Sequence, residues 1–247
     1  MSAFQGSIYS KTLDMMMGLS VVLPDFPRKK REKYPVLYLL HGLGDNHQSW
    51  LLRTRIERYA FEHDLVVIMP EVQRSYYTDT QSGLKYFQFV ANELPEICSN
   101  LFPITSDPEQ TFIAGLSMGG YGALKTALTY PDRYKAVASF SGAVDVKRMF
   151  ENTEWSMYGK EGYALFGEHI APENDIRMLT VKASKDRANL PHIYLSCGLS
   201  DSLYEQNKDL RTQLDFLKIP YLYEEWGGGH TWDFWEESIK RFINFIF

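Results

Sequence analysis

The stretch Gly115-Leu116-Ser117-Met118-Gly119 decides the fold, because a strand-like run precedes it and a helix-like run follows it. Residues 111–114 are apolar and β-prone, and residues 120–128 have helical spacing that ends before Pro131. The five residues alone would also fit a glycine-rich helix start with a capping serine. The strand–turn–helix context instead predicts a strained turn that exposes a nucleophilic serine hydroxyl at the carboxyl edge of a sheet. Both flanking glycines have a steric reason, since a Cβ there would meet neighbouring backbone.

Outward from this turn, strand-like and helix-like runs alternate along most of the chain. The expected strands are residues 4–13, 15–23, 35–40, 65–69, 111–114, 136–141, 192–197 and 221–225. The expected helices are residues 49–63, 86–101, 120–128, 203–217 and 231–247, with a kink at Pro95. The alternation predicts an α/β fold with a mostly parallel sheet, opened by an antiparallel pair and covered by helices on both faces.

The alternation breaks down between residues 145 and 189, where aromatic residues, glycines and charges are scattered. We interpret this segment as short helices inserted as a small cap over the edge of the sheet. No repeat, linker or low-complexity stretch is visible in the sequence. Residues 1–247 are therefore expected to form one domain that carries this cap insertion.

Composition restricts the classes of function. With a net charge of −5 and one short basic cluster at residues 28–31, the chain is not expected to bind nucleic acid. No group of His, Asp or Glu residues has metal-ligand spacing, and no motif requires a cofactor, so neither is expected. Without an apolar run of membrane-spanning length or a signal-like start, we expect a cytoplasmic protein that does not enter a membrane. The two cysteines are expected to be buried free thiols.

A serine hydroxyl needs a base to take its proton, and that base is usually a histidine oriented by a carboxylate. In folds with this kind of turn, the order along the chain is serine, acid, histidine. Asp201 and His230 each follow one of the last two expected strands, and three glycines before His230 would let its loop approach the serine. We therefore predict Ser117, Asp201 and His230 as a catalytic triad. Asp145 also follows a strand and is the rival acid, with capping of the inserted segment as its alternative role.

The tetrahedral intermediate of such a reaction needs amide donors for its oxyanion. The N–H of Met118, directly after the serine, is the first predicted donor. The second is the N–H of Leu43, in the loop after strand 35–40, where Gly42 lets the chain turn inward. His41 lies in the same loop, and we expect it to brace the loop rather than to act as a base.

Several motifs together resemble the esterase D family. They are His41-Gly42-Leu43-Gly44-Asp45-Asn46, Arg74-Ser75-Tyr76-Tyr77-Thr78-Asp79, Glu93-Leu94-Pro95, the glycine-flanked turn at Ser117, and Gly229-His230-Thr231-Trp232. The similarity runs from about Phe4 to the end of the chain and is weakest over residues 146–189. Within the family, the sequence is most similar to the bacterial tributyrin esterases.

The resemblance implies an α/β-hydrolase fold and a serine carboxylesterase that acts on short acyl chains. Because the insert at residues 145–189 is short and rich in aromatic residues, we expect the acyl groups to range from acetyl to butyryl, with acylated sugars among the substrates. The resemblance also implies an acyl-serine intermediate, a small-molecule ester as the partner, and oxyanion amides at Leu43 and Met118. Feruloyl, acetyl-xylan and S-formylglutathione ester hydrolysis and acyl transfer are the alternatives. Residues 71–84 form a short loop without the aromatic-acidic stretch of formylglutathione hydrolases, which argues against a glutathione substrate. A non-catalytic binding module is disfavoured because all three triad residues are present.

The sequence says less about the residues that contact the substrate. Five aromatic residues are candidates for lining the pocket, and the alternative for each is a place in the core: Trp50, Tyr76, Tyr77, Trp155 and Trp232. The oligomeric state is also left open, and a homo-oligomer is compatible with the sequence.

Overall fold

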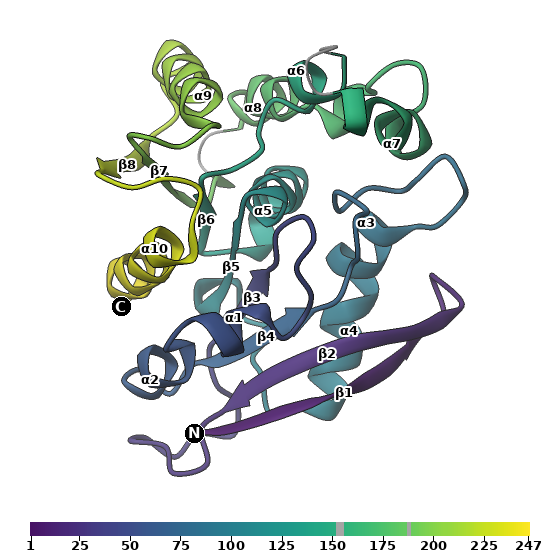
Figure 1. Ribbon diagram of the computed structural model, residues 1–247. Helices are drawn as coiled ribbons and strands as arrows, with labels where there is room; N and C mark the ends of the chain where they lie inside the picture. Colours follow the sequence, from purple (N-terminus) through teal and green to yellow (C-terminus); the bar gives the residue numbers. More distant parts are fainter. Residues whose placement is uncertain (152–155, 187–188) are drawn as a thin grey trace.

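A computed structural model of the protein describes residues 1–151, 156–186 and 189–247. Within these residues the centre is an eight-stranded sheet with the order β1-β2-β4-β3-β5-β6-β7-β8 (Figure 1). The β1–β2 and β2–β4 pairs are antiparallel, and every other neighbouring pair is parallel. The mostly parallel sheet with an antiparallel opening is therefore confirmed.

The strands lie close to the expected positions. They are β1 Ser2–Ser10, β2 Met15–Leu23, β3 Val36–Leu40, β4 Val66–Pro70, β5 Thr111–Leu116, β6 Ala136–Phe140, β7 His192–Gly198 and β8 Tyr221–Trp226. Every residue of β3, β4 and β6 is buried. This burial explains their continuous apolar sequences, because a central parallel strand is covered on both faces.

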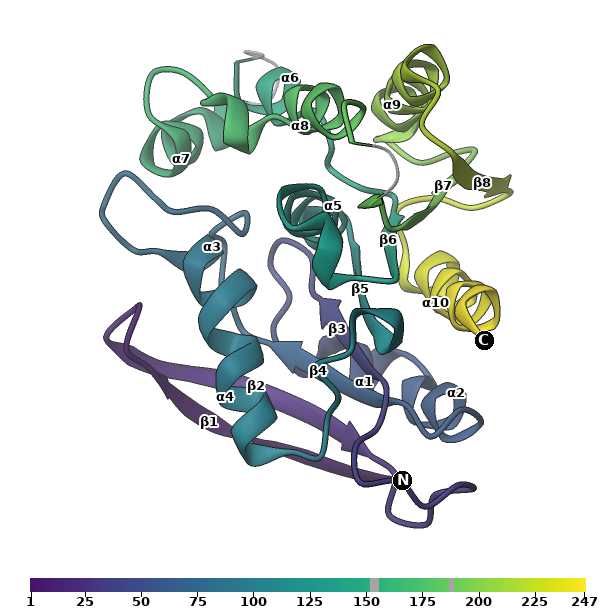
Figure 2. The ribbon, with the colours of Figure 1, turned by 180° about the vertical axis from the view of Figure 1, so that it is seen from behind.

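Helices cover both faces of the sheet (Figures 1 and 2). Beside one face lie α1 Ser49–Arg53, α2 Ile56–Phe61 and α10 Trp232–Ile246, which share an apolar cluster with Leu37 and Leu39 of β3. Beside the other lie α4 Leu94–Leu101, α5 Met118–Thr129 and α9 Tyr204–Leu217, whose cluster includes the alternate β3 residues Tyr38 and Leu40. The two clusters follow the alternation of side chains along a strand.

Two of the expected helices differ in detail. The expected helix 49–63 is two helices, because the Thr54 hydroxyl and N–H both donate to the carbonyl of Trp50 and Thr54 leaves in an extended conformation. The expected helix 86–101 consists of α3 Tyr86–Gln88, a π-helical stretch at Phe89–Glu93 and α4. Pro95 has no N–H to offer the carbonyl of Ala91, four residues earlier, and Arg133 Nη1 donates to that carbonyl instead at 3.1 Å.

The segment between β6 and β7 is built from short helices, as expected. They are α6 Val146–Glu151, α7 Ser156–Phe166, a 3₁₀ turn at Pro172–Asn174, and α8 Ile176–Ala183. In both views these helices group together near α5 and α9, away from the β1–β2 hairpin (Figures 1 and 2). Ile176 and Leu179 of α8 join the core cluster that contains α5.

Candidate active site

Ser117 stands between β5 and α5 in a strained backbone conformation, with φ 52° and ψ −116°. A positive φ is unfavourable for a residue with a side chain, so the surroundings must hold it in place. The Ser117 N–H donates to the carbonyl of Phe140 at 2.9 Å, and its carbonyl accepts from the N–H of Ala143 at 3.0 Å. The end of β6 thus fixes the predicted turn from both sides of the serine.

The glycines on either side of Ser117 are required by close backbone contacts. A Cβ on Gly115 would lie 2.4 Å from the carbonyl group of Gly119. A Cβ on Gly119 would lie 2.4 Å from the carbonyl oxygen of Leu40 and 2.7 Å from that of His41. These distances leave no room for any other residue, and they bring the start of α5 directly against the end of β3.

The structure brings the three predicted triad residues together. His230 Nε2 lies 2.9 Å from Ser117 Oγ, and His230 Nδ1 lies 3.0 and 3.1 Å from the two carboxylate oxygens of Asp201. The Asp201 side chain is fully buried, whereas the His230 ring is 30% exposed. An imidazole held in this way donates from Nδ1 to the carboxylate and keeps Nε2 free to accept the hydroxyl proton.

The carboxylate of Asp201 is held in its charged form. Burial raises its pKa, but the hydrogen bond and electrostatic attraction from His230 and the Leu203 N–H, which donates at 2.8 Å, outweigh burial and leave the pKa lowered. Asp201 therefore remains an acceptor for the Nδ1–H of His230.

The glycines before His230 also allow a close contact with the loop that carries Asp201. A Cβ on Gly198 would lie 2.3 Å from the carbonyl oxygen of Gly228, and that same oxygen accepts the N–H of Ser200 at 2.9 Å. The glycine-rich loop thus packs against the loop that carries Asp201, while His230 at its end reaches Ser117. This contact sets the spacing between the acid and the histidine.

The two predicted oxyanion donors are both available. Among the described residues, the N–H groups of Leu43 and Met118 have no hydrogen-bond acceptor. The Leu43 loop lies against the serine, because a Cβ on Gly42 would be 3.6 Å from the Cβ of Ser117. His41 braces this loop: its Nδ1 lies 2.8 Å from the Gly42 carbonyl oxygen, and its Nε2 accepts the Val72 N–H at 3.1 Å.

Asp145, the rival acid, lies elsewhere. Its carboxylate accepts the N–H of Arg148 at 3.0 Å, which caps α6, and forms an ion pair with Arg177 at 3.3 Å. Asp145 therefore has the capping role that the sequence offered as its alternative.

The candidate substrate-lining residues are mostly in the core. Trp50 and Tyr77 are fully buried, and their polar atoms donate to the carbonyls of Leu40 and His41, so the pocket-lining interpretation is wrong for both. Tyr76 is 1% exposed and is likewise a core residue.

The two remaining candidates are tryptophans. Trp232 is partly exposed and packs edge-on against both Trp50 and Trp235. It is therefore the one described candidate among the five with surface left for a substrate. Trp155 lies outside the described residues.

Three further residues support the site and were not singled out from the sequence. Trp235 packs edge-on against the His230 ring at a centroid distance of 4.8 Å. Tyr121 and Lys125 follow Ser117 along α5 at four-residue spacing, and both donate to oxygens of Asn174. In the sequence, only the four-residue spacing that places Ser117, Tyr121 and Lys125 on one face of a helix could have indicated the last two residues.

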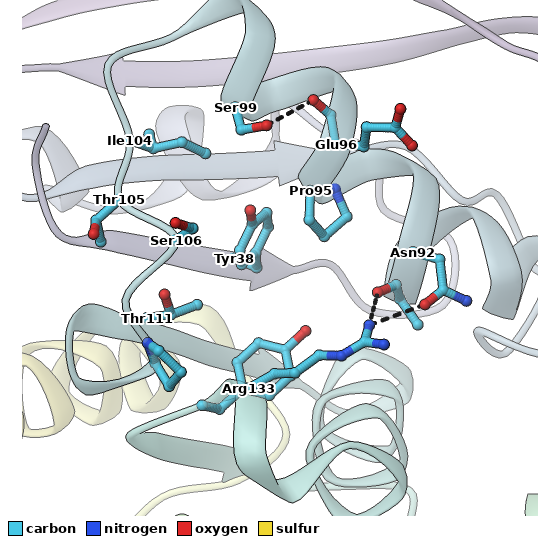
Figure 3. A pocket seen from close by; sticks show the side chains of 13 residues that line it. Tyr38, Asn92, Pro95, Glu96, Ser99, Ile104, Thr105, Ser106, Thr111 and Arg133 are labelled. Carbon is cyan, nitrogen blue, oxygen red and sulfur yellow. Dashed lines mark hydrogen bonds between the residues drawn. The ribbon is translucent and has the colours of Figure 1, made fainter.

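A separate cavity of about 290 Å³ lies at the opposite end of the sheet (Figure 3). Its lining includes Thr111, the first residue of β5, whereas Ser117 follows the last. Figure 3 shows Tyr38 within it and Arg133 hydrogen-bonded to Asn92 beside it. Its lining contains no triad residue.

Neither a metal cluster nor a membrane span is found in the parts of the chain that the structure describes. There, no three or more His, Cys, Asp or Glu side chains are grouped so that they could hold a metal ion. No helix in those ranges has the length and apolar character to cross a membrane.

Comparison with known proteins gives a consistent result. Residues 10–245 match the family described as "Putative esterase". The chain is 35% identical to an acetyl esterase of Caldicellulosiruptor saccharolyticus, over 98% of this chain and 96% of that protein.

Two solved structures from Staphylococcus aureus are similar over nearly their whole length. The fluorophosphonate-binding serine hydrolase FphF superposes with a TM-score of 0.90 at 32% identity, covering 99% of this chain and 98% of that one. The S-formylglutathione hydrolase FrmB superposes with a TM-score of 0.88 at 31% identity and the same coverage. Together with the family match, these likenesses show that the chain belongs to the esterase family and is a serine carboxylic ester hydrolase with the α/β-hydrolase fold.

Proposed function

We propose that the protein hydrolyses short-chain carboxylic esters through an acyl-Ser117 intermediate. The observation that carries this proposal is the hydrogen-bonded series from Ser117 Oγ through His230 to Asp201, with distances of 2.9 Å and 3.0–3.1 Å. A strained serine, a histidine base and a buried carboxylate in this order are the groups that acyl transfer requires. The family membership supports the same reading.

In the proposed reaction, Ser117 Oγ attacks the ester carbonyl carbon while its proton moves to His230 Nε2. The negative charge that develops on the carbonyl oxygen is stabilised by the N–H groups of Leu43 and Met118. When the carbon–oxygen bond of the ester breaks, the leaving alkoxide takes the proton from His230. A water molecule then attacks the acyl-serine with the same histidine as base, which releases the acid and restores Ser117.

We further infer that the natural substrate carries a short acyl group, such as acetyl to butyryl. The similarity to an acetyl esterase over nearly the whole chain supports a small acyl group. The motifs shared with the esterase D family, and within it the tributyrin esterases, favour the same range. In this proposal residues 1–247 form one domain, and the helices between β6 and β7 act as a cap that limits the length of the acyl pocket.

A thioester of glutathione is the second candidate substrate. The similarity to FrmB at 31% identity favours it, whereas the short loop at residues 71–84 speaks against it. Transfer of the acyl group to an alcohol instead of water would use the same intermediate. Product analysis in the presence of an acceptor alcohol separates hydrolysis from transfer.

The test combines covalent labelling with a substrate panel. A fluorophosphonate probe should label the wild type on Ser117, and Ser117→Ala should fold normally but lose both labelling and about 10⁴-fold or more of its hydrolysis rate. The panel comprises nitrophenyl esters of increasing chain length, acetylated sugars, feruloyl esters and S-formylglutathione. Equal labelling of the variant and the wild type would rule out Ser117 as the nucleophile.

A further inference from the structure

Lys125 is a buried cation on the helix that begins at the nucleophile. Its side chain is 1% exposed, and its Nζ donates to the Tyr77 carbonyl at 3.2 Å, to Thr78 Oγ1 at 2.9 Å and to Asn174 Oδ1 at 2.5 Å. All three acceptors are neutral oxygens. The lysine thus joins α5, the loop after β4 and the segment after β6 at one point, and the reaction proposed above makes no direct use of it.

The loop that Lys125 holds is strained. Tyr76 and Tyr77 both have positive φ angles, 50° and 49°, which two consecutive tyrosines adopt only when their surroundings impose it. The Tyr77 ring lies directly on α5, since a Cβ on Gly122 would be 2.4 Å from it. The hydrogen bond from Lys125 to the Tyr77 carbonyl fixes the backbone of this turn while α5 fixes its ring.

Tyr77 connects this turn to residues 41–46, the loop after β3 that carries the predicted oxyanion donor Leu43 and is called the oxyanion loop below. Its hydroxyl donates to the carbonyl of His41 at 2.9 Å, and that carbonyl is one of the two against which Gly119 packs. The His41 ring also lies 2.8 Å, at Nδ1, from the carbonyl oxygen of Gly42, the residue before Leu43. A shift of Tyr77 would therefore move the backbone that carries the Leu43 N–H.

We propose that Lys125 is a positioning residue for the oxyanion loop, acting through Tyr77 on the carbonyl of His41. The catalytic part of this inference rests on the proposed function, because only a reaction through a tetrahedral intermediate on Ser117 would use the Leu43 amide as an oxyanion donor. Displacing that donor by a fraction of an ångström weakens transition-state stabilisation more than substrate binding, so the effect falls on kcat.

The charge on Lys125 adds a pH dependence. Burial lowers its pKa to about 7, against the attraction of Asp79 in the loop after β4 and Glu173 in the 3₁₀ turn. The rings of Phe87 and Tyr121, 4.6 and 5.8 Å from Nζ, also favour the cation. An ammonium has three N–H donors and a neutral amine has two, so raising the pH through 7 removes one of the three hydrogen bonds at this junction.

The first test compares wild type, Lys125→Met, Tyr77→Phe and the double variant. At pH 6 each single variant should lose about tenfold or more in kcat with little change in KM, and the double variant should lose no more than the larger single effect. The kcat ratio of wild type to Lys125→Met should shrink about threefold or more between pH 6 and pH 9, because the wild type loses its ammonium. Any pH dependence of the reaction that does not involve Lys125 is common to both proteins and cancels in this ratio.

Thr126→Ala is the matched control. Thr126 is the next residue on α5, is fully buried, and donates only within its own helix, to the Gly122 carbonyl. It should change kcat less than about twofold at every pH. Two results would overturn the inference. One is a double variant whose loss in kcat equals the product of the two single losses, and the other is a ratio of wild-type to Lys125→Met kcat that does not change with pH. A lysine with a purely structural role would give both results.

The second test does not depend on activity. Amide hydrogen exchange over residues 41–46 should speed up in Lys125→Met and Tyr77→Phe by the same factor and remain unchanged in Thr126→Ala. Unchanged exchange in both variants would overturn the positioning role. A wild type that neither labels with fluorophosphonate nor cleaves any ester would overturn the proposed function instead, and the exchange result would still decide the role of Lys125.

Discussion

His230 Nε2 lies 2.9 Å from Ser117 Oγ, although the two residues are 113 positions apart in the chain. The sheet accounts for this closeness. Strands β5, β7 and β8 are parallel members of one sheet, so their carboxyl ends share an edge, and Ser117, Asp201 and His230 each follow one of them. The site is therefore assembled by topology, and the local loops only adjust the final distances.

The first prediction separates the two candidate acids. Asp201→Asn removes the acceptor that selects the Nδ1–H tautomer of His230 and should lower kcat by on the order of 10⁴, by analogy with other triads. Asp145→Asn should change kcat less than about threefold and lower stability by about 1 kcal/mol or less, since it removes the ion pair with Arg177 while an asparagine can still cap α6. Steady-state kinetics and urea unfolding of both variants provide the measurements. A larger loss of rate in Asp145→Asn would reverse the assignment.

The second prediction concerns stability in acid. The pKa of Asp201 is lowered in the folded protein, so its stabilising contribution is fully present above the unfolded value of about 3.8 and is lost as pH falls through the folded value. The difference in free energy of unfolding between wild type and Asp201→Asn should therefore shrink below about pH 4. Urea unfolding of both proteins at pH 6 and pH 3 measures it. A difference that stays constant over this range would contradict the prediction.

The third prediction concerns the contact between Gly119, at the start of α5, and the carbonyls of Leu40 and His41, where the oxyanion loop begins. In Gly119→Ala the new Cβ would meet the carbonyl oxygens of Leu40 and His41 at 2.4 and 2.7 Å, so the backbone must shift. We expect a loss of about 1–3 kcal/mol in stability and about 10²-fold in kcat. Gly6→Ala, in β1, is the control because nothing lies within 4 Å of its Cβ, and it should change stability by less than about 0.5 kcal/mol. Wild-type activity in a stably folded Gly119→Ala would show that this packing is dispensable.

The fold and the triad could be predicted because each depends on a local pattern. The glycines around Ser117 indicate a tight turn, and the apolar runs of β3 and β4 indicate buried parallel strands. Once the order of the strands is known, Asp201 and His230 follow from their places after β7 and β8. None of these predictions depends on how side chains from distant parts of the chain pack together.

The aromatic residues could not be assigned in the same way. Whether Trp50 or Tyr77 faces a pocket or the core depends on which carbonyl its polar atom reaches, and those carbonyls, of Leu40 and His41, belong to other elements. Lys125 was missed for the same reason. A lysine in a helix is normally solvent-exposed, and its burial depends on Asn174, 49 positions away.

The last prediction concerns the length of the acyl chain. The segment between β6 and β7 packs onto the rest of the protein through an aromatic cluster, in which Phe166 contacts Phe150 at a centroid distance of 5.3 Å and Tyr76 at 6.3 Å. A cap of fewer than about 50 residues encloses a small pocket and not a long groove. Each added methylene contributes about 0.8 kcal/mol only while it can be buried. For the wild type, kcat/KM should therefore hold or rise from acetyl to butyryl esters and fall by octanoyl.

Changing the cluster should move this limit. Phe166→Leu shortens a buried side chain within the cap and should raise the relative rate on hexanoyl and octanoyl esters. Phe216→Leu on α9, where the ring is 84% exposed, should leave the profile unchanged. Rates for a series of nitrophenyl esters, normalised to the butyryl ester, separate a change in pocket length from a general loss of activity. Efficient cleavage of palmitoyl esters by the wild type would contradict the small pocket, because a sixteen-carbon chain can be accommodated only by an open site.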